Sequence, residues 1–127
     1  MSYIGNIADT SPFRVFQTAE SLSGGAFTAV ELTANGVKTA GASSAVIGIL
    51  TAETELPIAA GDDVNVLVCG GGLWTTGESI QAGDALTSGA NGKAAKAASG
   101  KVIFARALES GKANQNVKVL ITREGKA

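Results

Sequence analysis

The residues that could form a reactive site are acidic, and they lie in the middle of the chain. They are Glu53, Glu55, Asp62, Asp63 and Asp84. Carboxylates of this kind can hold a hard cation or act as an acid and base pair. Their spacing is not that of an EF-hand loop, and Asp62 and Asp84 each follow a glycine, where a tight turn already explains an aspartate. We therefore expect turn residues and no metal site, with an enzyme based on Asp62 and Asp84 as an alternative.

Nucleophilic chemistry lacks its usual base, because the sequence contains no histidine. The single cysteine, Cys69, would need a carboxylate or a lysine to form its thiolate, and a cysteine at a strand end more often acts as a small apolar side chain. Gly92-Lys93 resembles part of a phosphate-binding loop, but Ala94 follows where a hydroxyl residue is required. The sequence thus predicts no catalytic residue, no cofactor and no enzymatic activity.

Composition narrows the possible partners. The 127 residues carry a net charge of −1, and lysine and arginine are spread along the chain, which argues against nucleic acid as a partner. The longest apolar runs are too short to cross a membrane, and the first residues do not resemble a signal peptide, so we expect a protein made and kept in a cytoplasm. Aromatic residues make up 5% of the chain, so the core is thin and self-association would stabilise it.

An internal repeat gives the strongest indication of the fold. The stretch ANGVKTAGASSAVIGIL, residues 34–50, aligns without a gap with ANGKAAKAASGKVIFAR, residues 90–106. Each copy starts with an Asn-Gly pair of the kind that closes a hairpin, Asn35-Gly36 and Asn91-Gly92. The first copy is rich in glycine and β-branched residues, so we expect a strand at residues 94–96 despite the high helix propensity of alanine and lysine. A helix over residues 93–99 is the alternative.

A second echo predicts two further turns. IAAGDDV, residues 58–64, resembles IQAGDAL, residues 80–86. In both, Gly61-Asp62 and Gly83-Asp84 should form tight turns in which the aspartate oxygen accepts a hydrogen bond from a nearby backbone N–H group. Short strands separated by such turns are typical of a small β-barrel or sandwich.

We therefore predict an all-β fold of two related modules, at about residues 24–70 and 80–122, within a β domain at residues 13–122. Residues 1–12 should form an extended N-terminal arm, residues 14–18 a first strand, the segment GGLWTTGES a linker, and residues 123–127 a frayed tail. The arm carries isolated apolar residues that could dock on a partner: Tyr3, Ile4 and Ile7.

Three aromatic residues each allow two interpretations. Phe13 and Phe16 fit a first strand that packs on its own domain, or a surface that contacts a partner. Trp74, the only tryptophan, could anchor an interface or cover the end of the barrel.

The layout from residue 80 onward, Gly-Asp-Ala-Leu, then Asn-Gly-Lys, then VIFARALES and NVKVLI, resembles capsid decoration, or cement, proteins of tailed phages. That small family was formerly labelled as of unknown function or as recombinase-like. The resemblance implies an all-β homotrimer on the capsid exterior of the virion, at local three-fold axes, which is assembled in the host cytoplasm and bridges subunits of the major capsid protein. The role of the arm in that contact is inferred from its own residues. A carbohydrate-binding module on a phage head or fibre is the alternative, with Trp74 and Tyr3 as stacking candidates.

Overall fold

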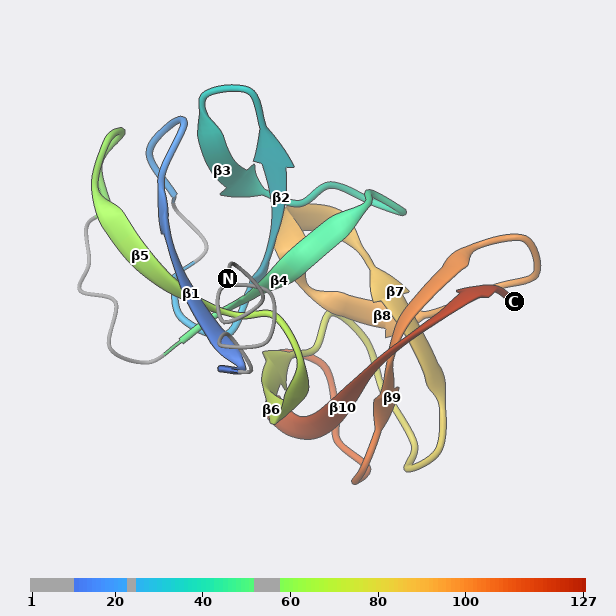
Figure 1. The fold of residues 1–127 in the computed structure, drawn as a ribbon. Coiled ribbons are helices and arrows are strands. Elements are labelled where there is room, and N and C mark those ends of the chain that lie inside the picture. The colour runs from blue at the N-terminus through green and yellow to red at the C-terminus, as the bar shows by residue number, and fades with distance from the viewer. Residues whose placement is uncertain (1–10, 23–24, 52–57) are drawn as a thin grey trace, which may run out of the picture.

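The computed structural model describes residues 11–22, 25–51 and 58–127, and these residues form two antiparallel sheets (Figure 1). The all-β prediction is confirmed. The first module consists of β1 (Phe13–Gln17), β2 (Ala29–Thr33), β3 (Gly36–Thr39), β4 (Val46–Leu50) and β5 (Asp63–Leu67). The second module consists of β6 (Gly70–Thr75), β7 (Ala85–Ser88), the 3₁₀ turn η1 (Ala90–Gly92), β8 (Ala94–Lys96), β9 (Val102–Ala107) and β10 (Asn116–Lys126).

The two modules have the same topology. The first sheet has the strand order β1-β5-β4-β2-β3 and the second has β6-β10-β9-β7-β8, so every strand of one has a counterpart in the other. Details away from the strands repeat as well: Thr18 bridges Val37 in parallel, and Thr76 bridges Ala94 in the same way. Each of these bridges joins the two outer strands at one end, so both sheets curl toward a barrel without closing. The internal repeat is therefore a repeat of structure.

The predicted linker and tail boundaries are wrong. Most of the segment GGLWTTGES lies in β6, which pairs with β10 from Thr75↔Asn116 to Gly70↔Ile121. The tail continues β10, where Gly125 and Lys126 pair with β9. Glycines and charged residues suggested irregular structure at both places, but the neighbouring strand supplies the hydrogen bonds that hold these segments extended.

The charged tail is also held by an ion pair. Arg106 donates two hydrogen bonds of 2.7 Å to the carboxylate of Glu124, and the Thr122 hydroxyl donates a third. The hydrogen bonds from Arg106 and Thr122 lower the pKa of Glu124 to about 2. These contacts connect β9 with the C-terminal part of β10.

The predicted turns are present. Asp62 Oδ2 accepts a hydrogen bond of 2.8 Å from Ala59 N, and Asp84 Oδ2 accepts one of 2.9 Å from Gln81 N. Gly61 and Gly83 have φ values of +86° and +90°, as the tight turns require.

The two Asn-Gly turns differ in form. β2 and β3 are joined through Ala34 and Asn35, and Gly36 begins β3. In the second module, Asn91 has φ 59° and ψ 29° and Gly92 has φ 72°, and Lys93 N donates to Ala90 O, which makes a type I′ turn. The chain then enters β8, so the predicted strand at residues 94–96 is confirmed and the helical alternative is wrong.

The core has two parts. One belongs to the first module and includes Leu22, Val30, Val37, Leu50, Ile58, Val64 and Val66. The other is shared between the modules, and combines Ala29, Ala40, Val46 and Ile49 with Trp74, Ile80, Leu86, Phe104, Val117 and Val119. Much of the shared core consists of small side chains around one tryptophan, so the two sheets approach each other closely.

Trp74 lies at the centre of the shared core with 0% of its surface exposed. Its indole Nε1–H donates a hydrogen bond of 2.8 Å to Gly92 O, and its ring meets Phe104 edge to face, with 5.5 Å between centroids. The prediction that Trp74 contacts a partner is therefore wrong. The side chain neither caps a barrel end nor reaches the surface, because the two modules enclose it.

Arg123 also connects the two modules. Its guanidinium donates hydrogen bonds to three backbone carbonyls of the first module, at Val46 (3.1 Å), Ile47 (2.8 Å) and Val68 (2.8 Å). It also lies 4.9 Å from the ring centroid of Phe104. Burial lowers the pKa of Arg123, but the side chain stays charged because an arginine pKa remains far above neutrality.

Gly92→Ala should destabilise the protein more than Gly83→Ala. Both glycines have positive φ, which costs an alanine about 1–2 kcal/mol. At Gly83 a Cβ atom would meet nothing within 4 Å, whereas at Gly92 it would lie 2.6 Å from Ala29 O. We expect an additional loss of about 1–3 kcal/mol at Gly92, measured by denaturant unfolding. Equal losses would show that Gly92 does not fix the spacing of the modules.

Arg123→Lys should also destabilise the protein, because one ammonium group cannot reach three carbonyls as the guanidinium does. The expected loss in the free energy of unfolding is about 1.5–3 kcal/mol. Arg106→Lys is the matched control, since Arg106 forms an exposed pair with Glu124 worth about 0–1 kcal/mol. Thermal and denaturant unfolding of both variants would measure the two losses in the free energy of unfolding. A loss for Arg123→Lys no larger than that for Arg106→Lys would contradict the conclusion that Arg123 connects the two modules.

Candidate interaction surface

The partner-contacting residues predicted from the sequence are scattered in the structure. Tyr3, Ile4 and Ile7 lie outside the described residues. Phe16 is half-buried and packs against the core of the first module. Phe13 is the one that reaches the surface, with 48% of its area exposed.

β1 offers an exposed strand edge next to Phe13. The strand pairs with β5 on one side, from Phe13↔Leu67 to Gln17↔Asp63. In the part of the chain that the structure describes, β1 is an edge strand of its sheet. Val15 on this strand is 65% exposed, and such an edge can accept an extended segment from another chain.

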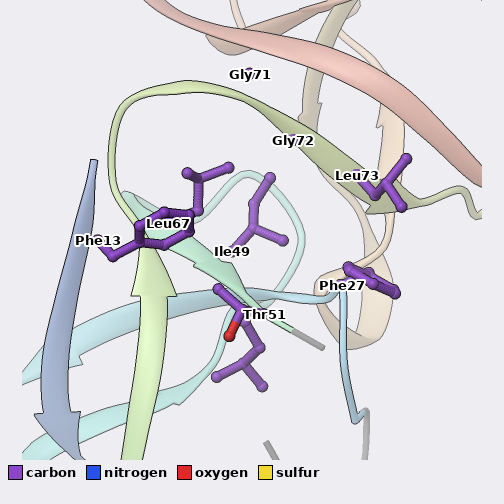
Figure 2. Close-up of a pocket in the computed structure, with 9 residues that line it drawn as sticks. Phe13, Phe27, Ile49, Thr51, Leu67, Gly71, Gly72 and Leu73 are labelled. Carbon is purple, nitrogen blue, oxygen red and sulfur yellow. The ribbon is translucent and has the colours of Figure 1, made fainter. Parts of the chain in front are cut away.

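An apolar groove lies beside Phe13, where the two modules meet (Figure 2). Its volume is about 260 Å³. β1, β4, β5 and β6 all contribute to the wall, together with the segment before β2. The lining residues are Phe13, Phe27, Ile49, Leu50, Thr51, Leu67, Gly71, Gly72 and Leu73. In Figure 2, Phe13 lies over Leu67 on one side, and Phe27 and Leu73 lie on the other.

Glycines in β6 form part of the wall of this groove. A Cβ atom on Gly72 would collide with the Leu67 side chain, whereas one on Gly71 would have ordinary clearance, 3.6 Å from Val119 O. The glycine run at Gly70–Gly72 is the sequence feature that coincides with this groove, but such a run also predicts an irregular linker. Only the pairing of β6 with β10 shows that these glycines form a wall.

One polar side chain in the groove has no partner. Thr51 is 8% exposed, and its Oγ1 makes no hydrogen bond in the structure. Leaving a buried hydroxyl unpaired costs about 1–3 kcal/mol. The hydroxyl oxygen is closed off from the open groove, so an occupant of the groove would meet mainly apolar side chains.

In two further pockets, the charged side chains named below already have hydrogen-bond partners within the protein. The first, about 210 Å³, includes Arg123, whose hydrogen bonds go to the carbonyls of the first module. In the second, about 390 Å³, Lys93 donates to Asn114, and Glu78 accepts from Lys96 N. Neither presents an uncommitted charged group aimed at a ligand.

Reactive groups are not assembled in the part of the chain that the structure describes. The carboxylates of Asp62 and Asp84 each accept a hydrogen bond inside their own turn, in different modules. The described residues contain no group of three or more potential metal ligands. Cys69 is an exposed free thiol between β5 and β6. Within the same residues, no helix has the length and apolar character needed to cross a membrane.

Comparisons with known proteins identify the fold. No protein-family model matches the sequence, and no curated protein matches it either. Among solved structures, the chain is similar to the N base of the head fibre protein gp8.5 of bacteriophage phi29, with a TM-score of 0.67 and 18% sequence identity. The alignment covers 91% of this chain and 96% of that chain. The two chains therefore share one fold over nearly their whole length.

Proposed function

We propose that this protein is a structural component of a phage virion that attaches to the outside of the head and cements neighbouring subunits of the major capsid protein. The supporting observation is the end-to-end similarity to the base of a phage head fibre. That neighbour is named as the base of a head fibre, and a cement protein likewise needs a compact body that attaches to the head. We further propose a homotrimer at local three-fold axes, as the family resemblance implies.

The joint between the modules suits a clamp. The shared core around Trp74 and the hydrogen bonds from Arg123 to the first module hold the two sheets against each other as one body. Three copies in one trimer would bind with an avidity above that of each contact alone. Binding to the assembled shell and not to free capsid subunits would stabilise the shell by mass action.

The contact with the capsid is proposed for the N-terminal arm and the open edge of β1. Phe13 and Val15 are large apolar side chains exposed on one edge strand, and the arm leads directly into that strand. An extended capsid segment that added to this edge would gain backbone hydrogen bonds as well as apolar contact.

The carbohydrate-binding alternative has lost its main candidate residue. A sugar-stacking aromatic side chain must expose its face, and Trp74 is fully enclosed by the two modules. The chain contains one tryptophan and one tyrosine, so no second tryptophan could take the sugar-stacking role expected of Trp74. We do not propose this function.

Purified protein should bind expanded, undecorated phage heads saturably and raise the temperature at which they release DNA. Removing residues 1–9 should leave the β signature in circular dichroism intact and weaken head binding by about tenfold or more, equivalent to about 1.4 kcal/mol. Val15→Ser should weaken binding too. Leu32→Ser is the matched control, because Leu32 is also an exposed apolar residue but lies on β2.

Two outcomes would contradict the proposal. Failure of the intact protein to bind any form of head would overturn cementing. Light scattering of the free protein measures its mass. A value of 12.6 kDa, the mass of one chain, even at high concentration would overturn the pre-formed trimer but not attachment to the head.

A further inference from the structure

The first module buries one face of its sheet against the second module. Across this sheet, Ala29 pairs with Ile49, and Ile49 pairs with Leu67. This buried row is at most 5% exposed, although the alternate residues of the same strands are the ones that form the module's own core. The second module covers the row, with Gly92 against the backbone of Ala29 and Gly72 against the Leu67 side chain. A module of this fold is therefore what buries this face.

The second module has a corresponding row. Both sheets have the same strand order, so β7, β9 and β10 take the places of β2, β4 and β5. Across these strands, Ala85 pairs with Arg106, and Arg106 pairs with Leu120. In the part of the chain that the structure describes, this row is open: the Leu120 residue and the Arg106 side chain are each 42% exposed. The face that is covered in one copy of the repeat is thus uncovered in the other.

A second leucine enlarges the open row. Thr51 N donates to Asn65 O in the first module, and Leu108 N donates to Lys118 O in the second, so Leu108 takes the place of the buried Thr51. Leu108 is 55% exposed and lies on the same side of the sheet as Leu120, one residue pair further along. We call Arg106, Leu108, Lys118 and Leu120 the outer face of the second module.

We propose that a second copy of this chain packs on the outer face of the second module. A module of the same fold already covers the equivalent face inside the chain, so a module of another copy has a suitable shape. The outer face carries apolar and charged groups of both signs, because Arg106 pairs with Glu124 and Glu109 accepts a hydrogen bond from Lys118 N. Copies can therefore meet there without like-charge repulsion. The inference rests on the proposed homotrimer, and it names the surface through which the copies meet.

Leu120→Ser and Leu108→Ser should each weaken self-association by about tenfold or more, because each removes a buried leucine from the contact. Sedimentation equilibrium over a series of concentrations would measure the dissociation constant. The intact chain should reach a multiple of 12.6 kDa. Leu32→Ser is the matched control, since Leu32 is 56% exposed but lies on β2 of the first module, and it should leave the constant unchanged. Circular dichroism reports whether each variant keeps its β signature.

A measurement on the intact chain covers the case in which a leucine variant does not fold. Lys118 lies on the outer face, opposite Leu108, whereas Lys38 lies on β3 of the first module with 42% of its side chain exposed. Acetylation of Lys118 by an amine-reactive ester should become slower, relative to that of Lys38, as the protein concentration rises and copies associate. Peptide mass spectrometry would measure both rates.

Several outcomes would overturn the proposal. These are a single-chain mass at every concentration, self-association that neither leucine variant weakens, an equal loss on Leu32→Ser, and acetylation of Lys118 that does not depend on concentration. Binding to phage heads separates this inference from the proposed function. An intact chain that self-associates through the outer face but binds no head would contradict cementing alone, whereas a chain that binds heads and stays monomeric would overturn this inference alone.

Discussion

The close approach of Gly92 in the second module to the backbone of Ala29 in the first sets the distance between the two modules, and the hydrogen bond from the Trp74 indole to Gly92 O holds this turn within the second module. Each module alone is a curled sheet of five short strands, and the second has much of its buried surface in the core that it shares with the first. Trp74 occupies the middle of that core, and its one polar atom needs an acceptor. Gly92 O is that acceptor, in a turn that has left-handed backbone geometry and passes close to Ala29. The tryptophan, the glycine and the neighbouring alanine therefore depend on one another.

The repeat also shows how two copies of one topology take different roles. The pairing of Phe16 with Val64 in the first module corresponds to that of Trp74 with Val117 in the second. The larger aromatic ring is in the second copy, and it faces the joint. At the start of the same strands, Phe13 pairs with Leu67 and Gly71 pairs with Leu120. A large side chain in one copy corresponds to a glycine in the other, and both line the groove.

The polar groups of the described residues mostly serve the fold. Aspartates close turns, threonines bond backbone carbonyls at the ends of β1 and β6, and the buried arginine holds the modules together. This is consistent with a protein that acts by contact. The Thr51 hydroxyl differs, because it is buried beside an open groove with no partner. Among the described residues, exposed apolar side chains lie on β1, at Phe13 and Val15, and also at Leu32, Val102, Leu108 and Leu120.

The all-β class, the repeat and the turns could be predicted from the sequence, because these depend on local chemistry. Gly61-Asp62 and Gly83-Asp84 form turns wherever the chain places them, and the repeat outweighed the helix propensity of residues 94–96. The sequence alignment of the two copies has no gap, but the structural correspondence shifts by one residue after the Asn-Gly turn. Leu32 pairs with Val37 in the first module, whereas Ser88 pairs with Ala94 in the second. Local patterns do not show which strand lies next to which. The strand at Gly70–Gly72, the extension of β10 through the charged tail and the enclosure of Trp74 depend on the folded chain, because in each case the partner lies far away in the sequence.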